Sequence, residues 1–283
     1  MWPDTKCNCC DGVYNSFDVH FTTLCDNKCK HCIDLNYSGI GISKPDVRAI
    51  CSTILANQDK IDDVLFLGGE PCLFLEELHE CIRTLRRETS LKLYVTTAVP
   101  KTCYDNKELF TRIIEDSDGV NLSVQHYNEE IADSIRRTIS QYDRQRFYAS
   151  LPYKEKIRIN LNVVKPFLYE KQMLVDCLRH YDLMGFNSIK LSEIQHGKEH
   201  FVSVEDIFEM KLGSPYAYGC QKYVELVPDM STPVLLKRSC FLCEETLKAS
   251  ISDGIKLLTK FFKLPQNTYG VVYEDGTLTK GWV

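Results

Sequence analysis

Residues 18–32, which read DVHFTTLCDNKCKHC, contain the two signals that decide the fold. Polar and apolar side chains alternate over 18–23, which is the period of a β-strand with one buried face. Cys25, Cys29 and Cys32 follow in a short loop. This order predicts a reactive site at the carboxyl end of a β-strand, where the active sites of βα barrels are found.

Five more strand-like segments follow, and five helix-like segments lie between the strands. Six strands joined by crossover helices require a parallel sheet, either doubly wound or curled into a barrel. The strands are predicted at 18–23, 64–68, 91–97, 120–126, 158–164 and 188–194. The helices are predicted at 44–57, 75–88, 106–116, 129–142 and 169–184.

Polar side chains recur on one face of several of these strands, as at Asn121 and Ser123 in the fourth and at Asn160 and Asn162 in the fifth. A parallel strand packed on both faces would be apolar throughout. Polar groups are costly to bury without partners, so the pattern favours a partial (β/α)6 barrel of the α/β class around a polar ligand. The alternative is a one-residue error in the strand boundaries, which would reverse the faces.

The regular alternation of strand-like and helix-like segments ends at about residue 200. A hairpin is predicted from 223–227 and 234–237, a helix over 244–262, and a last hairpin around 274–276. These segments predict a small α+β extension that closes over the barrel. The expected domains are an N-terminal arm at 1–17, the barrel at 18–200 and the extension at 201–283.

The composition is that of an ordinary globular protein, with 44% hydrophobic and 26% charged residues. The formal net charge of -5 provides no basic surface, so nucleic acid is not the expected partner. Arg136, Arg137, Arg144 and Arg146 are expected on a solvated face. The sequence shows no secretory signal or membrane span, which predicts a cytoplasmic protein. Some of its 14 cysteines are then expected to bind metal.

Three thiolates on one short loop can hold three corners of an iron–sulfur cube and leave the fourth iron without a protein ligand. A structural zinc site needs four ligands, and His31 is at most a strained fourth here. A zinc knuckle or unligated thiols remain the alternatives.

The spacing Cys-x3-Cys-x2-Cys, together with the GGEP sequence at 68–71, resembles the radical S-adenosylmethionine (radical SAM) superfamily over about 18–196. The resemblance implies a [4Fe–4S] cluster and S-adenosylmethionine as cofactors. It further implies one-electron reduction by an external donor such as flavodoxin or ferredoxin. The resulting 5′-deoxyadenosyl radical would abstract hydrogen from a substrate.

His31 takes the family's aromatic position between the last two cysteines. The third strand ends in Thr96-Thr97-Ala98, where many members have Asn-Gly. The residues that the resemblance assigns to cofactor binding are His31, Gly68, Gly69, Glu70, Pro71, Ser123, Asn162 and Glu193. The candidates for substrate contact and catalysis are Gln125, Arg158 and Lys190, with His126 as a further contact.

Cys220, Cys240 and Cys243 resemble the twitch or SPASM extensions, which hold an auxiliary cluster in some members of the superfamily. A fourth ligand would come from Cys7, Cys9 or Cys10, or from substrate. The alternative is that these are reduced packing thiols.

Three functions remain open at this point. The first is radical modification of a nucleotide or other small molecule, which Arg158, Lys190 and the viperin-like stretch at 20–22 favour. The second is a peptide-modifying maturase, which the auxiliary cysteines favour. The third is a non-catalytic, cysteine-rich metal-binding protein.

Overall fold

The computed structural model describes residues 15–29, 31–32, 44–138, 142–194, 198–211, 221–239 and 269–280. Within these residues ten strands form one sheet, in the order β10-β9-β1-β2-β3-β4-β5-β6-β8-β7. They are β1 (Ser16–His20), β2 (Asp63–Leu67), β3 (Lys92–Thr97), β4 (Gly119–Ser123), β5 (Ile157–Val163), β6 (Ser188–Glu193), β7 (Gln221–Val224), β8 (Val234–Lys237), β9 (Tyr269–Tyr273) and β10 (Leu278–Thr279). The six predicted barrel strands are confirmed as β1 to β6, which pair in parallel with their neighbours.

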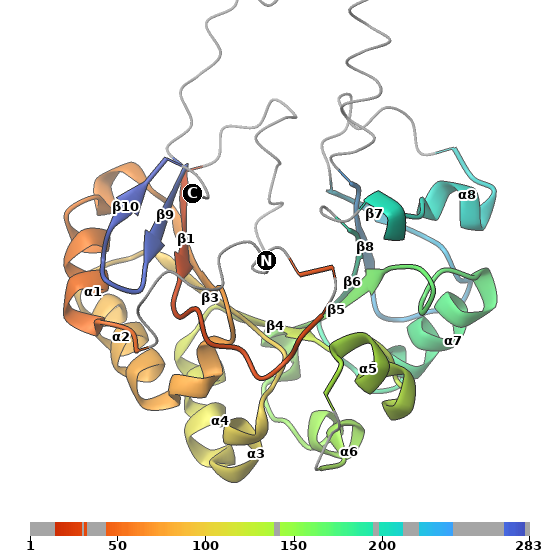
Figure 1. Ribbon diagram of the computed structural model, residues 1–283, viewed down its shortest axis with the longest axis horizontal. Helices are drawn as coiled ribbons and strands as arrows, with labels where there is room; N and C mark the ends of the chain where they lie inside the picture. Colours follow the sequence, from red (N-terminus) through yellow and green to blue (C-terminus); the bar gives the residue numbers. More distant parts are fainter. Residues whose placement is uncertain are drawn as a thin grey trace, which may run out of the picture.

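The sheet curves into an open arc, and the helices lie along its outer side (Figure 1). This arrangement is the partial barrel that the alternation of strands and helices predicts. The helices are α1 (Val47–Leu55), α2 (Leu75–Glu88), α3 (Lys101–Asp105), α4 (Lys107–Asp116), α5 (Glu129–Arg136), α6 (Arg144–Ala149), α7 (Lys171–Asp182) and α8 (Val204–Phe208). Each helix in this described part of the chain is too short or too polar to cross a lipid bilayer.

Apolar side chains of the barrel strands β1 to β6 lie in the core between the sheet and the helices. Val120, Leu122 and Ile159 are fully buried there, as is Leu78 of α2. Burying a side chain of this size stabilises the fold by about 1.5 to 3 kcal/mol. The apolar residues of the alternating pattern therefore face the helices, as the sequence predicts.

The polar side chains of the same strands form hydrogen bonds across the sheet. The register aligns Thr96 with Asn121 and Asn121 with Arg158. Arg158 Nε donates to Asn121 Oδ1 at 2.6 Å, and Asn121 Nδ2 donates to Thr96 Oγ1 at 3.0 Å. These bonds offset the cost of burying Asn121 and Arg158.

The predicted helix over 129–142 is wrong in its second half. It ends at Arg136 because Arg137 adopts a left-handed φ of 57°, which terminates helical hydrogen bonding. Asp143 then caps the separate helix α6 by accepting from the backbone of Arg146 at 2.9 Å. The expected solvated face is also wrong for two of its four arginines, because Arg136 and Arg144 are buried.

Both predicted C-terminal hairpins are present, as β7–β8 and β9–β10. Each also joins the barrel sheet, because β8 pairs in parallel with β6 and β9 pairs in parallel with β1. The described part of the C-terminal segment therefore lengthens the sheet at both edges. The predicted helix over 244–262 lies outside the described residues, and the domain boundaries and the closing of the barrel stay predictions.

Candidate active site

The three cysteines of the first loop follow β1 at the carboxyl edge of the sheet. Within the described residues none of the three forms a disulfide, and the Cys32 amide donates to the Cys29 carbonyl at 3.1 Å. The described residues contain no group of three or more His, Cys, Asp or Glu side chains arranged around a single ion. Three thiols spread along one loop instead suit a cube-shaped cluster, whose iron corners each take one cysteine. The donor set therefore fits the [4Fe–4S] group.

The environment of the loop holds its sulfur and imidazole groups neutral in the absence of metal. Burial raises the pKa of Cys29 to about 11, the neighbouring Cys32 adds to this, and the positive charge of Arg136 opposes it. Burial also lowers the pKa of His31 to about 4, and the charge of His200 contributes. Iron must therefore displace a thiol proton from Cys29 when it binds.

The Gly68-Gly69 turn packs tightly against the start of the cysteine loop. Both residues have positive φ, at 82° and 50°. A Cβ atom on Gly68 would lie 2.3 Å from the His20 ring, and one on Gly69 would lie 2.3 Å from the carbonyl oxygen of Leu24. Only glycine fits at these positions. The structure thus brings together the two motifs that the sequence analysis singled out.

Glu70 ties this turn to the end of β3. Its Oε1 accepts from the Cys72 amide at 3.0 Å and from Thr97 Oγ1 at 2.6 Å, and its Oε2 accepts from the Ala98 amide at 2.6 Å. Burial raises the pKa of Glu70 to about 7, and these hydrogen bonds oppose that rise. Pro71 is buried behind it and begins a short 3-10 helix, η3 (Pro71–Phe74). Thr97 and Ala98, where the sequence departs from the family pattern, therefore support the turn.

Replacement of Glu70 by alanine should destabilise the protein by about 4 kcal/mol, because it leaves two buried donors and one partly buried donor without this acceptor. Urea unfolding of the metal-free protein measures this change. Glu80→Ala is the matched control, since Glu80 is an exposed carboxylate on α2, and it should cost about 0.5 kcal/mol or less. Equal midpoints for the two variants would show that the Glu70 hydrogen bonds do not support the fold.

The other predicted cofactor contacts occupy two kinds of environment. Ser123 and Asn162 are partly buried on β4 and β5, and Asn162 Nδ2 donates to Gln125 Oε1 at 3.4 Å. Glu193 is fully buried and accepts from the backbone amides of Val204 at 2.9 Å and Ser239 at 2.7 Å. Those two bonds connect β6 to the C-terminal segment, and the role of all three residues toward a cofactor stays a prediction.

Two of the predicted substrate-contacting residues belong to a positively charged part of the sheet. Lys190 lies beside Asn160 of β5 in the register of β6. Its pKa is well below the usual value because of burial first, and then because of the charges of Arg158 and Lys237, while Asp18 opposes the shift. Burial and the charges of Arg158 and Lys237 therefore favour the neutral amine of Lys190, and the positive charge here comes from Arg158 on β5 and Lys237 on β8.

Gln125 and His126 follow β4 directly. Gln125 has a φ of 69°, and the His126 amide donates to the Val124 carbonyl at 2.9 Å, which makes a tight turn. The His126 ring stacks on Tyr127, and Tyr127 stacks on His180 of α7. Side chains held in such strained turns are common at active sites, which keeps Gln125 a candidate.

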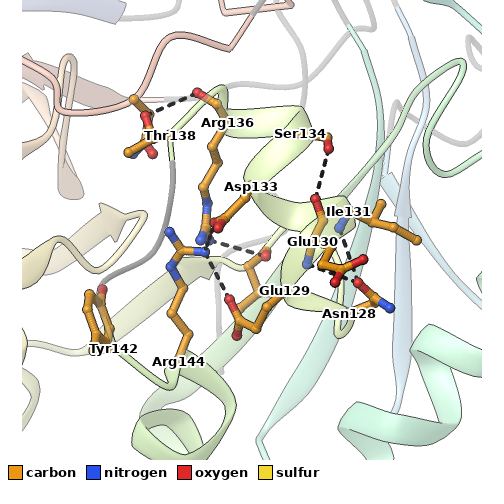
Figure 2. Close-up of polar contacts among 12 residues, drawn as sticks. Asn128, Glu129, Glu130, Ile131, Asp133, Ser134, Arg136, Thr138, Tyr142 and Arg144 are labelled. Carbon is orange, nitrogen blue, oxygen red and sulfur yellow. Dashed lines mark hydrogen bonds and ion pairs between the residues drawn. The ribbon is translucent and has the colours of Figure 1, made fainter.

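The end of α5 holds the cysteine loop in place, a feature that the sequence analysis missed. The Lys28 amide donates to the Arg136 carbonyl at 2.8 Å, and Thr138 Oγ1 donates to the Asp26 carbonyl at 2.9 Å. Asn128 starts this helix by accepting from two backbone amides with its side chain (Figure 2). That cap could be recognised in the sequence, but the contact of the other helix end with the loop could not.

The predicted auxiliary metal site cannot be placed on this framework. Cys220, Cys240 and Cys243 lie outside the described residues, as do Cys7, Cys9 and Cys10. The auxiliary cluster therefore stays a prediction.

The family model described as the Radical SAM superfamily matches residues 19–151, which include the cysteine loop, the GGEP turn and α5. The chain carries a radical SAM domain. The superfamily to which such domains belong uses a [4Fe–4S] cluster and S-adenosylmethionine. No curated protein sequence matches the chain.

Solved structures share the fold of this chain. SuiB from Streptococcus suis bound to its precursor peptide SuiA matches with a TM-score of 0.63 at 13% identity, over 95% of this chain and 60% of SuiB. SuiB without the peptide matches with a TM-score of 0.62, and SuiB bound to S-adenosylmethionine with 0.57, at the same identity and coverage. The chain thus spans 60% of the length of SuiB, and the likeness at this identity is one of fold.

Proposed function

We propose that this chain is a radical SAM enzyme that modifies a peptide. The observation that supports the proposal best is the fold shared with SuiB, a protein solved with a precursor peptide bound, because the likeness covers 95% of this chain. The match therefore extends well beyond the 19–151 region of the family model. In this proposal a chain-like substrate pairs with one of the sheet edges that β7 to β10 form.

The residues of this chain have separate roles in the proposed reaction. When bound, the cluster and S-adenosylmethionine supply a 5′-deoxyadenosyl radical that abstracts hydrogen from the substrate. Cys25, Cys29 and Cys32 hold the cluster. Gly69 allows the turn to approach the loop, and Glu70 fixes that turn by its three hydrogen bonds.

The polar inner face of the sheet orients the substrate in this proposal. Arg158 supplies positive charge there, and Gln125 and Lys190 supply hydrogen bonds. The electron comes from an external donor such as flavodoxin or ferredoxin.

A second candidate function is the modification of a small anionic molecule such as a nucleotide. The charges of Arg158 and Lys237, both of which act on Lys190, favour it. Those charges would also bind acidic groups of a peptide, so an experiment has to distinguish a peptide substrate from a small anionic one.

The test is a product assay on anaerobically reconstituted enzyme reduced with dithionite. We expect 5′-deoxyadenosine to form from S-adenosylmethionine, and a defined library of synthetic peptides to raise its rate and yield peptides of altered mass. A rate raised only by a mixture of ribonucleoside triphosphates would instead support the small-molecule function. No 5′-deoxyadenosine under any condition would leave the non-catalytic alternative.

A further inference from the structure

Arg136, the last residue of α5, is a buried cation with an unusual set of partners. Its side chain is 1% exposed. Its Nη2 donates to the Ser123 carbonyl at 2.9 Å and the Val124 carbonyl at 3.2 Å, and lies 3.5 Å from the Tyr148 hydroxyl. Its Nε and Nη1 are buried and have no hydrogen-bond partner among the described residues. All the partners that the guanidinium has are uncharged.

Arg144, nearby on α6, is a buried guanidinium whose charge is balanced by carboxylates, which is the usual arrangement for a buried cation. It forms ion pairs with Glu129 at 3.0 Å and with Asp133 at 2.6 Å (Figure 2). Arg136 comes from the same helix as those two carboxylates, yet it forms no ion pair within the described part of the chain. An uncompensated buried charge costs several kcal/mol, so a charge retained in this place calls for an anion.

The position of Arg136 indicates which anion this is. Its backbone carbonyl accepts from the Lys28 amide at 2.8 Å, inside the cysteine loop. Thr138, two residues further along, donates from its Oγ1 to the Asp26 carbonyl of the same loop at 2.9 Å. Arg136 therefore lies beside the loop that holds the cluster, on the side of α5 and the end of β4.

A loaded cluster supplies the missing negative charge. Each cysteine binds iron as a thiolate, and reduction adds one further negative charge to the same small volume. A fixed cation in a poorly hydrated environment stabilises the reduced form more than the oxidised form, because that interaction grows with the charge of the cluster.

We propose that Arg136 is the internal counter-cation of the iron–sulfur cluster and raises its reduction potential. The inference rests on the cluster of the proposed function. The charge of Arg136 makes the transfer of an electron to the cluster more favourable. Arg136 is thus a positioning residue, and it need not touch the substrate.

The test is a redox titration of the reconstituted protein without S-adenosylmethionine, monitored by the electron paramagnetic resonance signal of the reduced cluster. Arg136→Gln keeps an amide donor for the β4 carbonyls and removes the charge. We expect about a tenfold lower ratio of reduced to oxidised cluster at a fixed solution potential, which for one electron corresponds to a midpoint lower by about 59 mV. Iron per chain should equal that of the wild type.

Two further variants separate charge from packing. Arg136→Lys keeps the charge and should stay within about twofold of the wild-type ratio, a shift of well under 59 mV. Arg137→Met removes the neighbouring exposed arginine and should leave the titration unchanged. An unchanged midpoint in Arg136→Gln overturns the inference, and so does an equal loss in Arg136→Lys. If Arg136→Gln takes up no iron, the Lys variant decides: a wild-type midpoint supports the role of charge, and a tenfold loss overturns it.

The same titration separates this inference from the proposed function. A wild-type protein that forms a cluster but yields no 5′-deoxyadenosine would contradict the proposed function and leave the Arg136 result standing. A wild-type protein that cleaves S-adenosylmethionine, with an unchanged midpoint in Arg136→Gln, would contradict the inference alone.

Discussion

Replacement of Cys29 by alanine should abolish 5′-deoxyadenosine formation and lower the iron bound per chain. Cys29 is the middle of the three loop cysteines, and a cube held by only two thiolates loses a second protein corner. The variant should fold like the wild type, because Cys29 forms no disulfide and is only partly buried. Iron analysis and the visible absorbance of the cluster measure the loss of iron, product detection by mass spectrometry measures the loss of activity, and circular dichroism checks the fold.

Cys177→Ala is the matched control for this experiment. Cys177 is also a free thiol, but it is buried in α7 among the core residues. Its removal should leave iron and product unchanged relative to folded protein. Wild-type iron content in Cys29→Ala would remove Cys29 from the ligands of the cluster.

Replacement of Gly69 by alanine should destabilise the protein by about 3 kcal/mol or more. The left-handed backbone alone costs an alanine about 1 to 2 kcal/mol. The new Cβ would also lie 2.3 Å from the Leu24 carbonyl oxygen and 2.5 Å from that of Thr22. Forcing those backbone atoms apart adds about 1 to 3 kcal/mol. Urea unfolding of the metal-free protein measures the sum.

Gly185→Ala separates the two contributions. Gly185 also has positive φ, at 71°, but a Cβ there would meet no atom within 4 Å. This variant should therefore lose only the backbone contribution of about 1 to 2 kcal/mol. An equal loss of stability in the two variants would mean that the cysteine loop moves to accommodate the methyl group. The close contact between Gly69 and the loop would then not be required.

The barrel strands could be predicted because their pattern is local. Polar and apolar residues alternate over 120–126 and 158–164, and this pattern predicts which side chains face the helices. The structure buries the same set of apolar residues. The cysteine spacing and the GGEP turn also identify the family without any knowledge of contacts. The position of Gly69 against Leu24 needed the structure, since it joins two segments that only the sheet brings together.

Arg136 could not be interpreted correctly from the sequence, because its environment depends on where one helix ends. A helix over 129–142 and the loop after it would have carried four arginines on a solvated face. The left-handed turn at Arg137 ends the helix early, buries Arg136 and places its carbonyl on the cysteine loop. A run of charged residues predicts an exposed helix face only if the helix boundaries are predicted correctly.

The pairing of β9 with β1 has a consequence for synthesis of the protein. The strand that leads into the cysteine loop gains a hydrogen-bonded neighbour on that side only after residues 269–273 have been translated. Until then β1 presents an unpaired edge on the nascent chain, and such edges pair readily with other chains. A ribosome that stalls within the preceding segment would thus release a product whose metal-binding loop sits beside an aggregation-prone strand.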